Sequence, residues 1–287
     1  MKVYGDYTQE ELNRQYNQAA LVPDFSDYIE QNRERSKSVR KDIPCKLDIP
    51  YGPSLDERLD IFPTKAHEAP ILIYHHGGAW CRGNNKGSSY IAESCVSKGV
   101  NLVIPGFSLA PKVTLDEIVR QNHAAIVWSY HHAKDFGGNS NRIYVGGHSS
   151  GGHLAAMMLV TDWSGEYGLP ENLIKGAVCL SGMYDLEPVR LSHRNEYLFL
   201  DERSANRNSP ILYIPEYKLP IVIGYGDGEH DEFKRQSDSF AAAWEAAGHP
   251  MTKIIMKNQN HFEVEREWAK KDSPIMKRLW AMLGLDE

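Results

Sequence analysis

The sequence predicts an α/β protein with a mostly parallel central sheet flanked by helices. Short apolar runs recur along the chain with helix-length segments between them, the alternation expected of parallel strands joined by crossover helices. Of the 287 residues, 41% are apolar, so the chain can bury a substantial core. We therefore expect a single domain over residues 1–287.

Two polar helices are expected at the N-terminus. Residues 8–11 read T-Q-E-E, the S/T-x-x-E form of a capping box, which predicts a helix from there toward residue 20. A second polar helix is expected over residues 24–38. Residues 1–40 should therefore form an N-terminal helical extension to the sheet.

The apolar runs that follow are typical of strands buried on both faces. Prolines at positions 44 and 50 punctuate an extended region before the first of these strands. The strands expected from there on are 58–62, 71–74, 100–104, 142–146, 176–180, 220–225 and 253–256, and the longer helices between or after them are 115–134, 152–161, 232–247 and 275–283.

The segment 184–219 breaks this alternation. It is polar, contains three prolines and is longer than an ordinary connection. It is expected to be either a lid or specificity insertion over the site or an irregular surface excursion, and the sequence does not choose between the two.

Charge and composition exclude several classes of partner. The formal net charge is −6 and no basic block occurs, so nucleic acid is not an expected partner. The mixed cluster at residues 33–41 is interpreted as a solvated helix end. No apolar run approaches the roughly 18 residues of a membrane span, and no signal peptide is evident.

The four cysteines are scattered along the sequence, which indicates free thiols in a cytoplasmic protein. Whether the protein forms a homo-oligomer stays open.

Residues 147–151 read G-H-S-S-G, which fits the pattern G-x-S-x-G. A predicted strand ends at Gly146, and a predicted helix begins within a few residues. In that setting the pattern indicates a sharp strand-to-helix turn that exposes a serine hydroxyl. The N-terminus of the following helix favours an oxyanion beside it. Ser149 is therefore the expected nucleophile.

A serine hydroxyl needs a base, and in this kind of site the chain order is serine, acid, histidine. His261 follows the last predicted strand directly, whereas the other late histidines precede it. We expect His261 to be the base. The acid should follow the strand that ends at Tyr225, where both Asp227 and Glu229 qualify. Spacing alone does not choose between these two carboxylates.

Residues 75–80 read H-H-G-G-A-W and follow the predicted strand 71–74. Glycines let a backbone turn its N–H groups toward a developing oxyanion. We expect the amides of Gly77, Gly78 and Ser150 to form an oxyanion hole, with His76 as an anchor of the loop. Trp80 and Tyr184 are candidate walls for an aromatic substrate.

No metal site or cofactor is expected. The chain contains no H-E-x-x-H motif and no cysteine–histidine cluster, although His148 and His153 flank the predicted turn. No G-x-G-x-x-G window follows a predicted strand, so a dinucleotide is not expected either. The expected partner is a small-molecule substrate.

The sequence resembles the bacterial arylformamidases, or kynurenine formamidases, of the α/β-hydrolase superfamily. The likeness covers nearly the whole chain, and its most specific matches are residues 76–80 (H-G-G-A-W), 147–154 (G-H-S-S-G-G-H-L), 181–188 (S-G-M-Y-D-L-E-P) and 231–237 (D-E-F-K-R-Q-S). In these relatives the acid lies four residues before the phenylalanine of the last segment, which favours Glu229. Two departures from the family, Ala79 and the glycine- and asparagine-rich residues 82–87, are expected to border the pocket and to affect the choice of substrate.

The resemblance implies an α/β-hydrolase fold and a serine hydrolase that cleaves an N-formyl arylamide such as N-formylkynurenine to the amine and formate. The same residues would serve a carboxylesterase for short acyl or aryl esters, or a related amidase or carbamate hydrolase. A non-catalytic ligand-binding relative is disfavoured because both the serine and the histidine are present.

Overall fold

An eight-stranded sheet forms the centre of the protein in the computed structural model, which describes residues 1–285. The strand order is β10-β9-β8-β7-β5-β6-β4-β3. Strands β3 and β4 are antiparallel to their neighbours, and the remaining pairs are parallel. The strands are β3 (Lys46–Pro50), β4 (Arg58–Phe62), β5 (Ala69–His75), β6 (Asn101–Pro105), β7 (Gly138–His148), β8 (Ile174–Leu180), β9 (Ile221–Gly226) and β10 (Met251–Met256).

Alternate residues of the central strands enter two different cores. Ile71 and Ile73 of β5 belong to a cluster with helices α4 (Leu115–His132), α5 (Ser150–Val160) and α10 (Asp231–Ala246). Leu72 and Tyr74 belong to a second cluster with α3 (Ala92–Ser97) and α12 (Pro274–Leu283). Successive strand side chains point to opposite faces, so a strand covered by helices on both sides is apolar throughout. That is why these strands are recognisable as continuous apolar runs.

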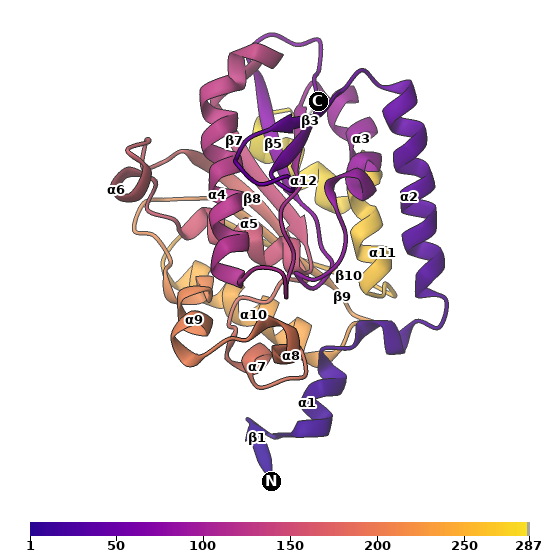
Figure 1. Cartoon of the computed structure of the whole chain (residues 1–287), viewed down its shortest axis with the longest axis vertical. Coiled ribbons are helices and arrows are strands. Elements are labelled where there is room, and N and C mark those ends of the chain that lie inside the picture. Colours follow the sequence, from indigo (N-terminus) through magenta and orange to yellow (C-terminus); the bar gives the residue numbers. More distant parts are fainter. Residues whose placement is uncertain (286–287) are drawn as a thin grey trace.

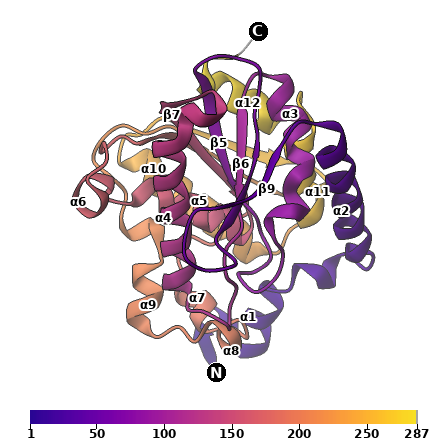
Figure 2. The same ribbon diagram turned by 45° about the horizontal axis from the view of Figure 1, so that its top comes forward.

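The N-terminal extension lies along one side of the molecule, opposite α4 (Figures 1 and 2). It begins with a short hairpin, β1 (Lys2–Tyr4) and β2 (Tyr7–Thr8), followed by α1 (Gln9–Gln15), a 3₁₀ turn over Gln18–Leu21 and α2 (Phe25–Asp42). The predicted capping box is present, since Thr8 N–H donates to Glu11 Oε2 at 2.7 Å. Helix α2 runs beside α3 and α11 (His261–Arg266).

The predicted strands and the longer helices are present, with different bounds at several ends. The first helix ends at Gln15 instead of extending toward residue 20, and the strand expected over 142–146 extends from Gly138 to His148. Strand β3 was not predicted. It is an edge strand with mostly exposed side chains, so it carries no apolar run that would mark it.

The segment 184–219 folds into short helices at the end of the molecule near α1 (Figure 1). Several of its apolar side chains, including Val189 and Leu198, are buried in the core beside α5 and α10. It is therefore a packed insertion and not a loose surface excursion. Its helices are α7 (Glu187–Arg190), α8 (Asn195–Leu198), α9 (Glu202–Arg207) and a 3₁₀ turn over Pro210–Leu212.

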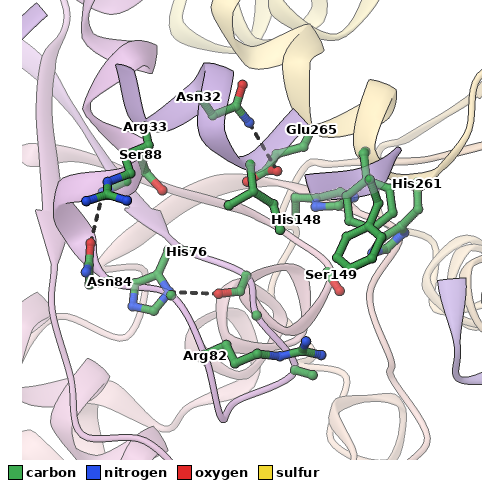
Figure 3. A pocket seen from close by; sticks show the side chains of 18 of the residues that line it. Asn32, Arg33, His76, Arg82, Asn84, Ser88, His148, Ser149, His261 and Glu265 are labelled. Atoms are coloured by element: carbon green, nitrogen blue, oxygen red, sulfur yellow. Dashed lines mark hydrogen bonds between the residues drawn. The ribbon is translucent and has the colours of Figure 1, made fainter. Parts of the chain in front are cut away.

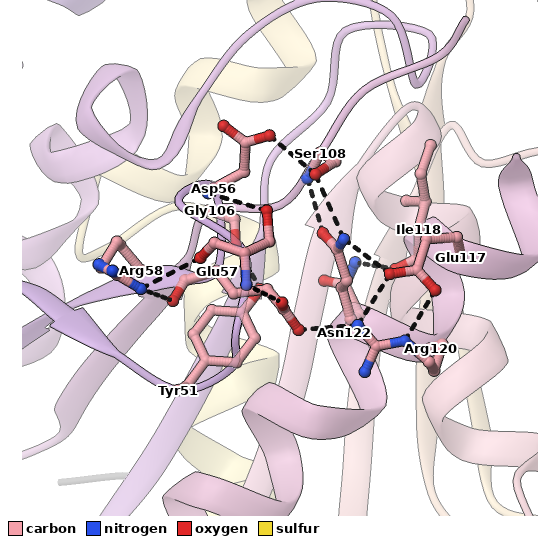
Figure 4. A network of polar contacts seen from close by, with 12 residues as sticks. Tyr51, Asp56, Glu57, Arg58, Gly106, Ser108, Glu117, Ile118, Arg120 and Asn122 are labelled. Carbon is pink, nitrogen blue, oxygen red and sulfur yellow. Dashed lines mark hydrogen bonds and ion pairs between the residues drawn. The ribbon is translucent and has the colours of Figure 1, made fainter. Parts of the chain in front are cut away.

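A buried polar network connects the start of β4 with α4 (Figure 4). The Glu57 side chain is inaccessible to solvent and pairs with Arg120 Nη2 at 2.8 Å, while Ser54 N–H donates to its second oxygen at 2.7 Å. Tyr51 O–H donates to the carbonyl of Gly106, which follows β6. These contacts satisfy the hydrogen-bonding groups that burial removes from water.

No helix within residues 1–285 is both long and apolar enough to cross a membrane.

The two-sided core predicts a strong contrast between two leucine variants. Leu72 is fully buried in β5, whereas Leu55 is 85% exposed. We expect Leu72→Ala to lower the free energy of unfolding by about 2–5 kcal/mol, since it removes buried methyl groups and leaves a cavity. Leu55→Ala should change it by less than about 0.5 kcal/mol. Urea unfolding followed by circular dichroism measures both, and equal effects would contradict the described packing.

Candidate active site

Ser149 occupies a sharp turn between β7, which ends at His148, and α5, which begins at Ser150. Its backbone has φ 58° and ψ −126°, in the left-handed region that few non-glycine residues adopt. The predicted strand–turn–helix setting of the G-x-S-x-G pattern is thus confirmed. Backbone strain of this kind is common at functional sites.

Two glycines permit this turn. A Cβ at Gly147 would lie 2.2 Å from the carbonyl oxygen of Gly151, and a Cβ at Gly151 would lie 2.0 Å from the carbonyl oxygen of His75. Both contacts are with backbone atoms, which cannot move aside as a flexible side chain can. The end of β5, the end of β7 and the start of α5 therefore meet at distances that only glycine allows.

His261 and Glu229 lie together although 32 residues separate them. His261 Nδ1 lies 2.9 Å from Glu229 Oε2, and both side chains are almost completely buried. Glu229 Oε1 accepts hydrogen bonds from Ser181 Oγ at 2.6 Å and from Gly226 N–H at 2.8 Å. The carboxylate is thus fixed on both oxygens. It holds the imidazole in the tautomer with the proton on Nδ1, so Nε2 is free to accept a proton.

Asp227, the other carboxylate that spacing left open, points elsewhere. Its Oδ1 accepts from Asn258 N–H at 2.7 Å, and its Oδ2 lies 3.4 Å from Lys257 Nζ. It organises the loop after β10 and makes no contact with His261. The geometry therefore agrees with the choice of Glu229 that the family resemblance favoured.

The H-G-G loop passes directly over Ser149. A Cβ at Gly77 would lie 3.5 Å from Ser149 Cβ, and Gly78 has φ 119°, which L side chains rarely adopt. His76 anchors the loop as expected, because its ring stacks on Phe107 at 4.2 Å and its Nδ1–H donates to the Gly77 carbonyl at 2.8 Å. Ser150 is the first residue of α5, so its N–H lacks a helical acceptor.

Trp80 and Tyr184 do not line the cavity, contrary to expectation. Trp80 is 1% exposed, and its Nε1–H donates to His153 Nδ1 at 3.1 Å. Tyr184 is fully buried and stacks on Phe240 at 4.3 Å. Their indole and phenol groups find polar partners in the interior, which lets both rings serve the core. Proximity in sequence to the oxyanion loop or to a strand end did not indicate which way these side chains point.

A cavity of about 620 Å³ opens in front of Ser149 and His261 (Figure 3). The N-terminal extension supplies much of its wall, a role that sequence reasoning missed. The departures from the family loop also border it, as expected, through Ala79 and residues 82–84. The lining residues of the extension are Tyr16, Asn17, Gln18, Ala19, Phe25, Ile29, Asn32, Arg33, Lys37 and Arg40.

The basic residues of α2 correct the interpretation of residues 33–41 as only a solvated helix end. Arg33 and Lys37 are exposed, as expected, but together with Arg40 they face the cavity. Their spacing of four and three residues places them on one face of the helix. Phe25 and Ile29 continue the same helical spacing toward the N-terminus. This repeat was the feature of the sequence that could have predicted which face of α2 lines a cavity.

Burial keeps the imidazoles around the site neutral. It lowers the pKa of His75, His76 and His153 to about 4. Burial and the neighbouring His261 hold the pKa of His148 well below its ordinary value. His75 Nδ1 lies 2.7 Å from Asn122 Oδ1, a contact that links the end of β5 to α4. These histidines are therefore uncharged supports of the site.

The family of the chain follows from comparison with known proteins. The BD-FAE family model matches residues 59–243, which include the H-G-G loop, the serine turn and most of α10. The chain belongs to the BD-FAE family. The kynurenine formamidases of Danio rerio and Salmo salar are 30% and 31% identical to it, each over 99% of both proteins.

Solved structures of hydrolases share the fold of this BD-FAE chain. A candidate thioesterase from Silicibacter sp. tm1040 is 26% identical with a TM-score of 0.83, over 96% of this chain and 99% of that one. An esterase of Pyrobaculum calidifontis shares the fold with a TM-score of 0.74 at 17% identity, over 93% and 97% of the two chains. The protein is thus a hydrolase of the α/β-hydrolase esterase and formamidase group.

The two carboxylates of this BD-FAE hydrolase predict a matched pair of variants. Glu229→Gln should lower kcat by roughly 10²–10⁴-fold, because a neutral amide neither fixes the His261 tautomer nor stabilises the imidazolium. Asp227→Asn should retain most activity. Steady-state kinetics on any turned-over substrate, with circular dichroism to verify folding, compares them; the reverse ranking would reassign the acid.

Buried neutral histidines also predict acid sensitivity. Burial lowers the pKa of His123 to about 4, whereas in the unfolded chain it is about 6.5. The unfolded state therefore binds more protons below pH 6.5, and stability falls as the pH decreases from 6.5 toward 4. His123→Asn should lose less stability than the wild type between pH 7 and pH 5, by on the order of 1–2 kcal/mol. Denaturant unfolding at both pH values measures this, and identical losses would contradict it.

Proposed function

We propose that this protein is a serine hydrolase that cleaves an N-formyl arylamide, such as N-formylkynurenine, to the arylamine and formate. The observation that carries the proposal is the Glu229–His261 pair beside the strained Ser149 turn, with His261 and Ser149 lining one cavity. Full-length similarity to kynurenine formamidases supports the choice of an N-formyl bond.

In the first step, Ser149 Oγ attacks the formyl carbon while His261 Nε2 takes the hydroxyl proton. The carbonyl oxygen becomes an oxyanion, which the amides of Gly77, Gly78 and Ser150 stabilise. Each such donor contributes about 2.7–4 kcal/mol to lowering the barrier. The buried Glu229 carboxylate stabilises the imidazolium that forms.

In the second step, the C–N bond breaks and the imidazolium donates its proton to the departing arylamine nitrogen. The formyl group remains as an ester on Ser149. Water then attacks this ester as His261 accepts one of its protons, and collapse of the intermediate releases formate and returns the proton to Ser149. A formyl group is small, so no long acyl pocket is required. An arylamine also leaves more readily than an alkylamine.

The second candidate is hydrolysis of short acyl or aryl esters. It is favoured by the similarity to esterases, including the LipQ esterase of Mycobacterium tuberculosis, which is 28% identical over 80% of this chain. The residues and steps would be the same, with an alkoxide or phenoxide as the leaving group. Only the relative rates on the two substrate classes separate the candidates.

Removal of the nucleophile tests the mechanism. Ser149→Ala should lower kcat by roughly 10³–10⁶-fold, because no oxygen remains to accept the formyl group. Ser164→Ala, at an exposed serine of α6 (Trp163–Tyr167), is the matched control and should retain full activity. Formate release from N-formylkynurenine is the measurement, with thermal unfolding to verify both folds. Formate release by S149A at a rate near that of the wild type would contradict the assignment of Ser149 as the nucleophile.

The substrate class is tested by comparing kcat/KM for N-formylkynurenine with that for a short nitrophenyl ester. We expect the formamide to be preferred. A strong preference for the ester would support the second candidate while leaving the proposed catalytic residues in place.

A further inference from the structure

Arg194 is a buried cation that no carboxylate neutralises. It belongs to the packed insertion 184–219, lines the cavity in front of Ser149 and is 6% exposed. Burial lowers the pKa of its guanidinium, and the neighbouring titratable groups are Tyr197, Tyr16, Cys81 and Arg82, none of which is a carboxylate. Within residues 1–285, no aspartate or glutamate forms an ion pair with it.

The contacts of Arg194 leave donors unused. Its Nη2 donates to the Tyr16 carbonyl at 3.0 Å, and its Nη1 lies 3.9 Å from the sulfur of Met183. The guanidinium also lies over the rings of Tyr16 and Phe233, at 5.2 Å and 5.7 Å from their centroids. A guanidinium carries five N–H donors in a planar fork that suits a carboxylate. One carbonyl and a thioether do not satisfy that set.

Three of the other five cations of the cavity have carboxylate partners, whereas Arg40 donates to the Lys86 carbonyl and to Ser89 Oγ, and Arg82 is exposed to solvent. Arg33 pairs with Glu30, Lys37 with Glu34 and Lys86 with Asp60. Among residues 1–285, six lysines and arginines line the cavity, and Glu265 is the one acidic residue that does so. In a chain of net charge −6, such a cavity favours an anionic ligand.

The ring of Phe233 lies between Arg194 and His261, the proposed catalytic base. Two neighbours of this ring are His261, with the ring centroids 5.1 Å apart, and the guanidinium of Arg194. A single aromatic ring thus separates the proposed base from the unpaired guanidinium. A substrate whose formamide reaches Ser149 can place an acidic group a few bonds away against Arg194.

We propose that Arg194 is the specificity-determining residue that binds the carboxylate of the substrate, so that the natural substrate is an N-formyl arylamine with a carboxylate on a short side chain. This inference rests on the proposed function. A bound carboxylate would supply the acceptors that the buried guanidinium lacks, since a buried charge requires a hydrogen-bonded partner. A structural role alone, in which Arg194 only holds the Tyr16 carbonyl, makes a different prediction.

The test compares two formamides, N-formylkynurenine and the neutral 2-formamidoacetophenone, which lacks the amino-acid group. Arg194→Met should lower kcat/KM for the carboxylated substrate by about 10–100-fold, mainly through KM, because a hydrogen bond to a charged group is lost. Its effect on the neutral substrate should stay within about threefold. Arg194→Lys should recover part of the loss. Arg203→Met, an exposed arginine of the same insertion, is the matched control and should change neither value.

Equal losses on both substrates, accompanied by a lower melting temperature, would show a structural role and overturn the inference. A second measurement does not depend on turnover. Calorimetric binding to S149A should be at least tenfold tighter for N-formylkynurenine than for the neutral amide, and R194M in that background should remove the difference. Equal affinities, or no binding of either compound, would overturn the inference.

Failure of the proposed function would be distinguishable from failure of this inference. If the wild type releases no formate but cleaves esters, the N-formyl assignment fails, and the same variants are compared on 4-acetoxybenzoate and neutral phenyl acetate. A carboxylate-specific loss in R194M then still assigns Arg194 as the anion-binding residue, and the absence of such a loss overturns that assignment as well.

Discussion

The close contact of three backbone segments at the Ser149 turn is the constraint on which the rest of the structure depends. The end of β5, the end of β7 and the start of α5 come together where Gly147 and Gly151 leave no room for a Cβ. This contact fixes the serine, aims the N-terminus of α5 and places the H-G-G loop above the hydroxyl. The parallel sheet holds the segments in place, because β5 and β7 are adjacent strands that end at the same edge.

The remaining parts of the site come from elements that are distant in sequence. Glu229 follows β9 and is fixed by Ser181 after β8, while His261 follows β10. Much of the cavity wall comes from the first 40 residues, and Arg194 comes from the insertion after β8. The loops at the ends of the sheet strands thus carry the proposed catalytic residues. The two additions to the sheet, which are the N-terminal extension and the insertion 184–219, help to form the space that a substrate would occupy. Choice of substrate therefore depends on the additions more than on the sheet.

The sequence was sufficient for features that local pattern determines. Strands buried on both faces appear as apolar runs, and the Ser149 turn depends on a five-residue pattern in its strand–helix setting. The edge strand β3 lacked such a run, and spacing could not separate Asp227 from Glu229 because both follow the same strand. Trp80 and Tyr184 were misplaced because side-chain direction depends on tertiary neighbours. The cavity-facing side of α2 was missed because a polar helix exposed to a cavity resembles one exposed to solvent.

Contacts between the two ends of the chain bear on how the protein is synthesised. Phe262, next to the proposed base, stacks on Phe25 of α2 at 5.5 Å, and Tyr28 of the same helix donates to Glu263 at 3.3 Å. Helix α2 is therefore a partner of α11, although Tyr28 and Glu263 are 235 positions apart in the sequence. Domains generally fold as units once enough chain has emerged. The nascent polypeptide contains the Gly147–Gly151 pattern well before residue 261 has been synthesised, so hydrolytic competence cannot arise until the proposed base and its contacts with α2 are in place.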